Sequence, residues 1–201
     1  RPALLDASRR RACKRLGLSP NRLTLLAMGG SQGALALNRL LAGMLKRMKK
    51  DRDPWARSLQ VLHLTGPRHL HEARRISPPK DLIYRPMGFL DRMQDAYAAA
   101  DIVLCRAGGS TLAEVTATGL PSLLVPYPHA ADDHQSRNAE VLSRAGAAAV
   151  LHQPDLTPRC LRRVISEMVQ DADMRKRMAE RAAAIGEPEA AWNVAHVLAR
   201  L

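Results

Sequence analysis

The sequence predicts a single α/β domain over residues 1–201, in which helices cover both faces of a parallel sheet. Short apolar segments alternate with longer amphipathic segments along the chain, which is the pattern of successive strand–helix units. Strands that alternate with helices pair in parallel. The 201 residues are 46% apolar, which is enough for one well-buried domain. The sequence shows no internal repeat and no convincing linker.

The first half of the chain opens with an amphipathic segment and continues with strand–helix units. Each expected strand is an apolar run of strand length, and each expected helix repeats apolar residues three or four positions apart. The run LTLLAM ends at two glycines, and the run LQVLHL ends before Gly66 and Pro67. In order, we expect a helix at 3–16, a strand at 23–28, a helix at 34–49, a strand at 59–64, a helix at 67–75, a strand at 82–85 and a helix at 90–99.

The second half continues the same alternation. The run IVLC precedes Arg106 and a glycine pair, and the run SLLV lies between two prolines. A long loop, PYPHAADDHQ, then leads into another amphipathic segment. In order, we expect a strand at 102–105, a helix at 111–118, a strand at 122–125, a helix that ends near residue 145, a strand at 147–151 and helical segments to the C-terminus.

The connections after strands differ in composition from the connections after helices. In a parallel sheet, all loops that follow strands lie on the edge where the strands end, which we call the carboxyl edge, and ligands bind there. These loops are rich in glycine, amides and hydroxyls: MGGSQGA, MGFLD, RAGGST and PYPHAADDHQ. The loops after helices consist of caps and breakers: DRDPWARS, SPPKD, TGLP and RAGA. The asymmetry predicts one functional edge.

The first loop at this edge, MGGSQGA, frames Ser31 and Gln32 with Gly30 and Gly33 between a strand and a helix. Glycines let backbone N–H groups approach a ligand closely, and a helix N-terminus favours an anion. The motif is neither G-x-G-x-x-G nor a Walker loop, so it does not support a dinucleotide or ATP site. The alternative interpretation is that these glycines only allow a tight turn between the strand and the helix.

The second loop places Arg106, Gly108 and Gly109 before a predicted helix start with Ser110 and Thr111. A diphosphate would find a guanidinium and free N–H donors here, as charge-assisted hydrogen bonds require. Glu114 would repel that phosphate, but a carboxylate accepts hydrogen bonds from vicinal ribose hydroxyls. Thr111 and Glu114 also have the spacing of a capping box, so a purely structural role for the carboxylate stays open.

The third loop leads into a helix that starts with His134, Gln135 and Asn138. Gln135 and Asn138 are three residues apart and share one helix face. Amides donate and accept hydrogen bonds, so both suit sugar hydroxyls. Metal binding by Asp132, Asp133 and His134 is disfavoured, because adjacent loop residues rarely converge on one ion and the acidic pair suits a helix start.

Two further metal-like patterns are interpreted as surface features. Asp51 and Asp53 form a D-x-D pattern, but they follow a helix and so lie on the opposite edge. His69 and His71 would need additional ligands, and none is evident nearby in the sequence. We therefore expect no metal and no cofactor. A nucleophile triad or an acid–base pair is likewise not evident at the carboxyl edge.

The net charge and the cysteine content indicate which classes of partner and which compartment to expect. The formal net charge is +12, from 31 Lys and Arg against 19 Asp and Glu, which favours an anionic partner such as a phosphorylated ligand or a membrane surface. Nucleic acid is disfavoured because aromatic residues make up 3% of the chain, and single-strand binders stack bases on aromatic side chains. The three cysteines lack C-x-x-C spacing and are expected to be reduced thiols in the cytosol. No stretch has membrane-span length, and no secretion signal is apparent.

Several motifs, in order, resemble the C-terminal half of the MurG family of bacterial glycosyltransferases. They are GGSQGALALN, the segment from MGFLD at residue 87 to AEVL at residue 142, and AGAAAVL. The resemblance runs from Arg1 nearly to the C-terminus. It implies a GT-B enzyme of two Rossmann-like domains, of which this chain would be the donor-binding one. The chain lacks a starting methionine, and we expect the N-terminal acceptor domain to be absent from it.

The resemblance also implies a role for each site residue. Ser31 and Gln32, between Gly30 and Gly33, would lie at the diphosphate of UDP-GlcNAc. The backbone around Phe89 and Leu90 would bind uracil, and Arg1 would approach the base. Residues 106–111 would hold the phosphates, Glu114 the ribose, and Gln135 and Asn138 the GlcNAc hydroxyls. Gly109 and Ser110 differ from the familiar relatives, so backbone contacts are expected there more than side-chain contacts.

The implied reaction is an inverting transfer of GlcNAc to the 4-hydroxyl of lipid-linked MurNAc-pentapeptide, on the cytoplasmic face of the plasma membrane. The general base and the acceptor surface, for lipid I, would belong to the absent domain, so this chain would hold no catalytic residue and would bind donor without turnover. Two alternatives stay open: a related enzyme with another acceptor, such as a glycolipid synthase, and a non-catalytic sugar-nucleotide-binding subunit.

Overall fold

A parallel sheet forms the centre of the protein. The computed structural model describes residues 8–30, 33–152 and 156–187, and these residues contain six strands in the order β3-β2-β1-β4-β5-β6. Every pairing is parallel. The strands are β1 (Leu23–Met28), β2 (Leu59–Leu64), β3 (Ile83–Met87), β4 (Ile102–Cys105), β5 (Ser122–Leu124) and β6 (Ala148–Val150). The predicted fold class is therefore confirmed.

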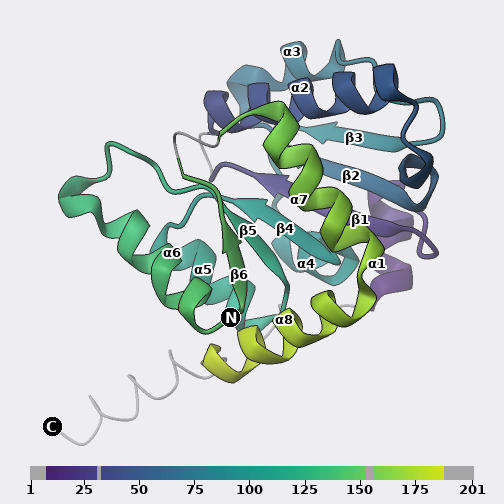
Figure 1. The fold of residues 1–201 in the computed structure, drawn as a ribbon. Helices are drawn as coiled ribbons and strands as arrows, with labels where there is room; N and C mark the ends of the chain where they lie inside the picture. The colour runs from purple at the N-terminus through teal and green to yellow at the C-terminus, as the bar shows by residue number, and fades with distance from the viewer. Residues whose placement is uncertain (1–7, 31–32, 153–155, 188–201) are drawn as a thin grey trace, which may run out of the picture.

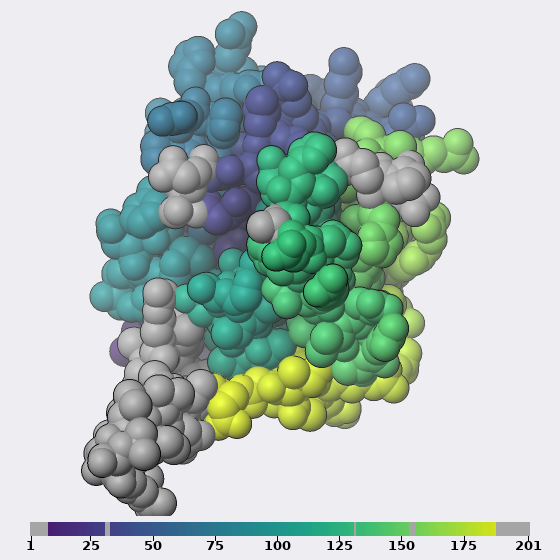
Figure 2. All heavy atoms as spheres, turned by 90° about the vertical axis from the view of Figure 1, so that its left-hand side faces the viewer, coloured from purple at the N-terminus to yellow at the C-terminus, as the bar shows by residue number. Residues whose placement is uncertain are grey.

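The order of the strands reverses at β1. The chain adds β2 and β3 on one side of β1 and then returns to place β4 on the other side. Ala27 in β1 thus pairs with both His63 in β2 and Leu104 in β4. Loops that leave β1 and β4 diverge at such a point and open a crevice outside the carboxyl ends. In Figure 1 this edge is on the left, and Figure 2 looks onto it.

Helices cover both faces of the sheet (Figure 1). Successive strand residues point to opposite faces, so Leu25 and Leu26 in β1 belong to different cores. One core contains residues of α2 and α7, and the other contains residues of α1, α4, α5 and α6. The helices are α1 (Arg9–Leu16), α2 (Leu35–Asp51), α3 (Leu70–Arg74), α4 (Met93–Ala99), α5 (Gly109–Ala117), α6 (His134–Arg144), α7 (Pro158–Gln170) and α8 (Ala172–Ile185), with the short 3-10 helices η2 (Pro54–Ser58), η3 (Pro67–His69) and η4 (Ala131–Asp133).

Several expected boundaries differ from the structure. The helix expected at 67–75 is divided into η3 and α3, and the helix expected at 90–99 begins only at Met93. The strand expected at 82–85 extends to Met87 and includes Pro86, which has no N–H to donate but is tolerated because β3 is an edge strand. The ends of the first and last expected helical segments lie outside the described residues. Among the described residues, no helix is long and apolar enough to span a membrane.

A partly exposed ion pair joins α1 to the start of the sheet. Arg9 Nη2 lies 2.8 Å from Asp101 Oδ2, and Arg9 Nη1 lies 3.1 Å from Asp101 Oδ1. The same carboxylate accepts a hydrogen bond of 2.7 Å from the backbone N–H of Thr24, while the N–H of Asp101 donates to the carbonyl of Thr24. A bidentate pair of this kind fixes geometry as well as distance. It therefore aligns the amino ends of β1 and β4, the two central strands.

A buried carboxylate anchors α4. Asp95 is 2% exposed and pairs with the guanidinium groups of Arg15 in α1 and Arg92, whose Nε lies 3.0 Å from Oδ2. The hydrogen bond from Arg15 is the main cause that lowers the pKa of Asp95. A buried carboxylate with two cationic partners holds the helix in one position. α4 is thereby fixed against α1.

A chain of buried polar groups crosses from β3 to α2. Asn38 Nδ2 donates to the carbonyl of Thr65 at 2.9 Å, so its Oδ1 accepts from His63 Nε2, also at 2.9 Å. His63 Nδ1 then accepts from the hydroxyl of Tyr84 at 2.8 Å. This arrangement requires the neutral imidazole with its proton on Nε2. Burial lowers the pKa of His63 to about 4, in agreement with that state.

This buried histidine predicts a pH-dependent stability. Between about pH 6.5 and pH 4 the unfolded chain binds a proton that folded His63 excludes, so the free energy of unfolding falls as the pH falls through this window. The loss approaches about 3 kcal/mol. Urea unfolding measured from about pH 7 to 4.5 should show this decrease in the free energy of unfolding in the wild type and not in His63→Gln. His71 is exposed, so His71→Gln is the matched control and should keep the pH dependence of the wild type. The same pH dependence in wild type and His63→Gln would contradict the prediction.

Candidate functional site

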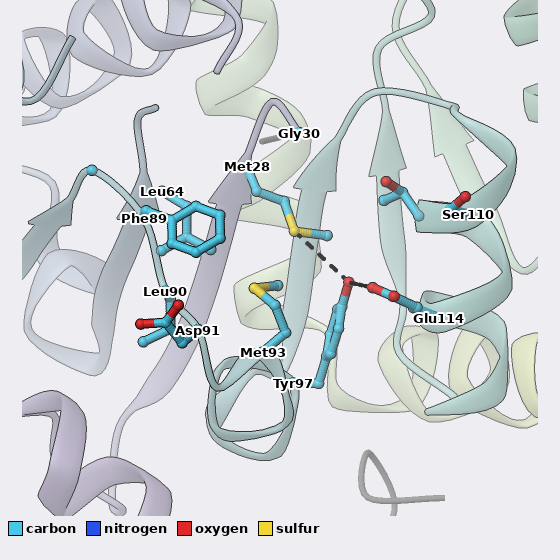
Figure 3. A pocket seen from close by; sticks show the side chains of 12 residues that line it. Met28, Gly30, Leu64, Phe89, Leu90, Asp91, Met93, Tyr97, Ser110 and Glu114 are labelled. Carbon is cyan, nitrogen blue, oxygen red and sulfur yellow. Dashed lines mark hydrogen bonds between the residues drawn. The ribbon is translucent and has the colours of Figure 1, made fainter. Parts of the chain in front are cut away.

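A cavity of about 440 Å³ opens at the carboxyl edge, beside the reversal of strand order. This volume lies within the range of small-molecule sites, roughly 300–1,000 Å³. Figure 3 shows Phe89, Leu90 and Asp91 on one side, Ser110 and Glu114 on the other, and Met28, Met93 and Tyr97 between them. The lining residues are Met28, Gly30, Leu64, Gly88, Phe89, Leu90, Asp91, Met93, Tyr97, Ser110, Thr111 and Glu114. The expected functional edge thus contains a site of suitable size.

The glycine loop after β1 is shaped by a close backbone approach. Gly33 has φ +76°, and a Cβ at this position would lie 2.1 Å from the carbonyl oxygen of Thr65. Only glycine fits such a conformation and contact. That carbonyl is held by Asn38, so the buried polar chain around His63 also supports the loop. Gly30, with φ +86°, lines the cavity.

Three of the predicted donor-binding residues, Arg1, Ser31 and Gln32, lie outside the described residues. Their roles at the base and the diphosphate stay predictions. Gly33 is described, but it is not among the residues that line the cavity. Its role in the structure is to let the loop turn against Thr65.

Phe89 and Leu90, predicted from the loop after β3, both line the cavity. Phe89 is 58% exposed and is the single phenylalanine of the chain. An exposed aromatic side chain at the mouth of a cavity offers a flat apolar surface for a planar ring. The backbone of this loop follows Gly88, where a Cβ would lie 3.2 Å from Cα of Pro67. The loop is therefore packed closely against the segment after β2.

The start of α5 forms the opposite wall. The helix begins at Gly109 with Gly108 as N-cap, and the cap makes no side-chain hydrogen bond. The first N–H groups of a helix have no partner within the helix and favour an anion. A Cβ at Gly108 or Gly109 would meet nothing within 4 Å. Ser110 and Thr111 line the cavity beside these N–H groups, so the predicted phosphate-binding segment does border the site.

Glu114 does not close a capping box. Because α5 begins at Gly109, two residues earlier than expected, Thr111 is already inside the first turn and its side chain makes no capping bond. Glu114 Oε2 instead accepts a hydrogen bond of 2.8 Å from the hydroxyl of Tyr97 and lines the cavity (Figure 3). The capping box that the sequence spacing suggested is therefore not formed. The carboxylate is positioned at the site.

The three remaining predicted residues hold loops together at the rim. Arg106 Nη1 donates to the carbonyls of Val125 and Pro126 at 3.1 and 3.0 Å, and its guanidinium lies 5.5 Å from the ring centroid of Tyr127. Burial lowers the pKa of Arg106, but an arginine side chain stays charged in proteins. Arg106 is not a lining residue of the cavity, so its contact with phosphate stays a prediction.

The two amides of α6 bind the neighbouring loops in a complementary way. Gln135 Oε1 accepts from the N–H of Tyr127 at 3.0 Å, and Asn138 Nδ2 donates to the carbonyl of Ala107 at 3.1 Å. These bonds use the carbonyl end of Gln135 and the amide end of Asn138. The other end of Gln135 is a hydrogen-bond donor and the other end of Asn138 is an acceptor, and both could bind a ligand beside α6. This helix projects toward the viewer in Figure 2.

The candidate metal patterns are occupied by protein contacts. Arg162 in α7 pairs with both carboxylate oxygens of Asp53, which is 5% exposed, and lies 3.3 Å from Asp51. Asp133 accepts a hydrogen bond of 2.6 Å from Ser136 at the start of α6. Within the described ranges, no group of three or more His, Cys, Asp or Glu side chains could hold a metal ion. The D-x-D pattern was interpreted as a surface feature, but the side chain of Asp53 is nearly buried in an ion pair with Arg162, and only Asp51 is exposed.

Sequence reasoning missed the floor of the cavity. Met28, Met93 and Tyr97 lie there, and none was selected as a site residue. Met93 and Tyr97 are four residues apart in α4 and so share one face, which is the signal that was available. Tyr97 is 3% exposed although its hydroxyl reaches Glu114. Such residues resemble ordinary core positions in a sequence.

Comparison with known proteins relates this site to a family of enzymes. A protein of Halothermothrix orenii named UDP-N-acetylglucosamine--N-acetylmuramyl-(pentapeptide) pyrophosphoryl-undecaprenol N-acetylglucosamine transferase is 37% identical over 194 residues, which cover 94% of this chain and 51% of that protein. A Burkholderia mallei protein of the same name is 40% identical over 184 residues, 89% of this chain and 48% of that protein. The chain therefore spans about half the length of the curated relatives it matches.

Solved structures give the same relationship. The crystal structure of Acinetobacter baumannii MurG matches with a TM-score of 0.82 and 29% identity, over 99% of this chain and 55% of that one. The calicheamicin glycosyltransferase CalG4 matches with a TM-score of 0.63 at 22% identity, over 91% and 44%, which is agreement in fold alone. The sequence matches the glycosyltransferase family 28 C-terminal domain over residues 24–194. The chain belongs to the glycosyltransferase family 28 C-terminal domain family.

Proposed function

We propose that this chain is the UDP-GlcNAc-binding domain of an inverting glycosyltransferase. The whole enzyme would transfer GlcNAc to the 4-hydroxyl of lipid-linked MurNAc-pentapeptide, converting lipid I to lipid II in peptidoglycan synthesis. The observation that carries this proposal is the cavity of about 440 Å³ at the carboxyl edge, where the N-terminus of α5 and the positioned carboxylate of Glu114 form one wall and Phe89 lies on the opposite side. Relatives that match nearly the whole chain carry the name of this transferase.

The cavity matches the chemical parts of a nucleotide sugar. Phe89 and the backbone after β3 offer a flat apolar wall for uracil. Glu114 presents a carboxylate oxygen that suits the vicinal hydroxyls of ribose. The N–H groups at the start of α5 and the glycine loop after β1 favour the diphosphate. Gln135 and Asn138 would then bind the GlcNAc hydroxyls.

The chain would contribute stabilisation of the leaving group. When the acceptor hydroxyl attacks C1 of GlcNAc, the C1–oxygen bond to UDP breaks and negative charge grows on the diphosphate. Preorganised N–H dipoles and nearby cations stabilise charge that develops in a transition state. The α5 N-terminus, with Arg106 behind it, provides such a field. We assign the general base and the lipid I surface to a separate acceptor domain of the whole enzyme.

The substrate also determines the proposed location. Lipid I is embedded in a membrane, so the enzyme would act as a peripheral protein on the cytoplasmic face of the bacterial plasma membrane. The net charge of +12 would support contact with anionic lipid. Nucleic acid is not a proposed partner. Competition between UDP-GlcNAc and UDP-glucose for the chain tests the choice of sugar against a glycolipid synthase, because the proposal expects UDP-GlcNAc to bind more tightly.

Removing the carboxylate of Glu114 should weaken donor binding. A charge-assisted hydrogen bond is worth about 1.5–3 kcal/mol, so Glu114→Ala should raise the Kd for UDP-GlcNAc by roughly 10- to 100-fold. Isothermal titration calorimetry measures this difference. Glu167→Ala, which removes an exposed carboxylate from α7, is the control and should bind like the wild type. If Glu114→Ala also bound like the wild type, the proposed site would be wrong.

Gln135 should contribute to recognition of the sugar and not of the nucleotide. Gln135→Ala removes the hydrogen bond to the loop at Tyr127, and a looser loop would weaken the binding of UDP and of UDP-GlcNAc equally. The ratio of their two Kd values isolates the sugar contact. Loss of one neutral hydrogen bond, about 0.5–1.5 kcal/mol, should reduce the preference for UDP-GlcNAc over UDP by roughly 2- to 10-fold. An unchanged ratio would remove Gln135 from the sugar site.

A further inference from the structure

We propose that Tyr97 is a positioning residue that orients the Glu114 carboxylate toward the ribose hydroxyls of the nucleotide. This inference rests on the proposed function and adds a residue to its site. Tyr97 lies on α4, whereas Glu114 lies on α5, so the pair connects two helices where the floor of the cavity meets one wall (Figure 3). The contact is therefore tertiary and not part of either helix.

The hydrogen bond has a defined direction. The hydroxyl of Tyr97 lies 2.8 Å from Glu114 Oε2 and 3.9 Å from Met28 Sδ. A carboxylate is a much stronger acceptor than a thioether, so the phenol proton points to Glu114. An ionised carboxylate only accepts, so with Oε2 directed toward Tyr97 the plane of the group and its remaining lone pairs have a preferred orientation.

This orientation matters because glutamate is flexible. A Glu side chain loses considerable rotamer freedom when a ligand fixes it. A hydrogen bond that already restricts the side chain in the unbound protein reduces this loss, and preorganisation of this kind increases affinity. Glu114 is only half-buried and lines the cavity, so the packing of α5 does not by itself immobilise its carboxylate. The hydroxyl of Tyr97 supplies one defined restraint on it.

Tyr97 is itself well fixed. Its side chain is 3% exposed and belongs to the core formed with α1, β1 and α5. The helix that carries it is anchored two residues earlier by Asp95, which pairs with Arg15 and Arg92. A phenylalanine would fill the same core volume, so the hydroxyl contributes through its contact with Glu114. A rigid donor on a rigid helix is the support that a flexible binding residue requires.

The experiment compares two ligands that differ only in the ribose. The affinities of wild type and Tyr97→Phe are measured for UDP and for 2′,3′-dideoxyuridine diphosphate, which lacks both vicinal hydroxyls. We expect Tyr97→Phe to raise the Kd for UDP by roughly 3- to 10-fold, the effect of losing one hydrogen bond. The Kd for the dideoxy analogue should stay unchanged. In the Glu114→Ala background, Tyr97→Phe should cause no further loss, because the two residues act as one unit.

Tyr84→Phe is the matched control. It removes another partly buried phenol hydroxyl, the one that donates to His63 outside the cavity, and should leave the ratio of the UDP and dideoxy affinities unchanged. If Tyr97→Phe raised the Kd for UDP and the Kd for the dideoxy analogue by the same factor, the role of Tyr97 would be purely structural and the inference would be overturned. If Glu114→Ala lowers the UDP-to-dideoxy preference and Tyr97→Phe does not, only the role of Tyr97 is wrong. If neither variant lowers it, the proposed ribose contact itself fails.

Discussion

The parallel pairing of β1 with both β2 and β4 is the constraint on which the rest of the structure depends. Because all strands run in one direction, every loop that follows a strand lies at the same edge of the sheet. Because β4 returns to the far side of β1, the loops after these two strands diverge and leave room between them. The glycine loop after β1 and the N-terminus of α5 therefore face one cavity, although they are some eighty residues apart in the sequence.

Hydrogen-bonded polar groups hold the sheet and the helices around the cavity in position. Asp101 aligns the amino ends of the two central strands through Arg9 and the backbone of Thr24. Asp95 fixes α4, which carries Tyr97. The chain from Tyr84 through His63 to Asn38 holds the carbonyl of Thr65, against which Gly33 turns. Asp95, His63 and Asn38 are buried, whereas Asp101 and Tyr84 are partly exposed. The hydrogen bonds of the buried groups offset the cost of burying them and specify the geometry.

At the rim itself, the polar side chains proposed as ligand contacts also hold the protein together. Arg106, Gln135 and Asn138 each bind the backbone of a neighbouring loop. Such bonds keep the loops after β4 and β5 in contact with α6, and they leave the cavity wall to Ser110, Thr111 and Glu114. The division agrees with a general feature of binding sites, in which supporting residues hold the contacting residues in position.

The sequence by itself determined the α/β class, most strands to within a residue or two, and the edge that bears the site. Apolar runs and glycine-rich loops are local signals, so they can be read without knowledge of the fold. Thr111 and Glu114 were selected because they follow a strand at a helix start, and Phe89 and Ser110 were implied by the family resemblance; all four line the cavity.

Only the tertiary structure decided between roles that share a local pattern. Thr111 and Glu114 have capping-box spacing, but the helix begins at Gly109 and directs Glu114 to Tyr97 instead. Met28, Met93 and Tyr97 resemble core residues in the sequence, yet they form the floor of the cavity. Arg106 has the chemistry of a phosphate ligand, yet its guanidinium binds two carbonyls. These outcomes depend on contacts between distant segments, and no local spacing specifies which partner a side chain meets.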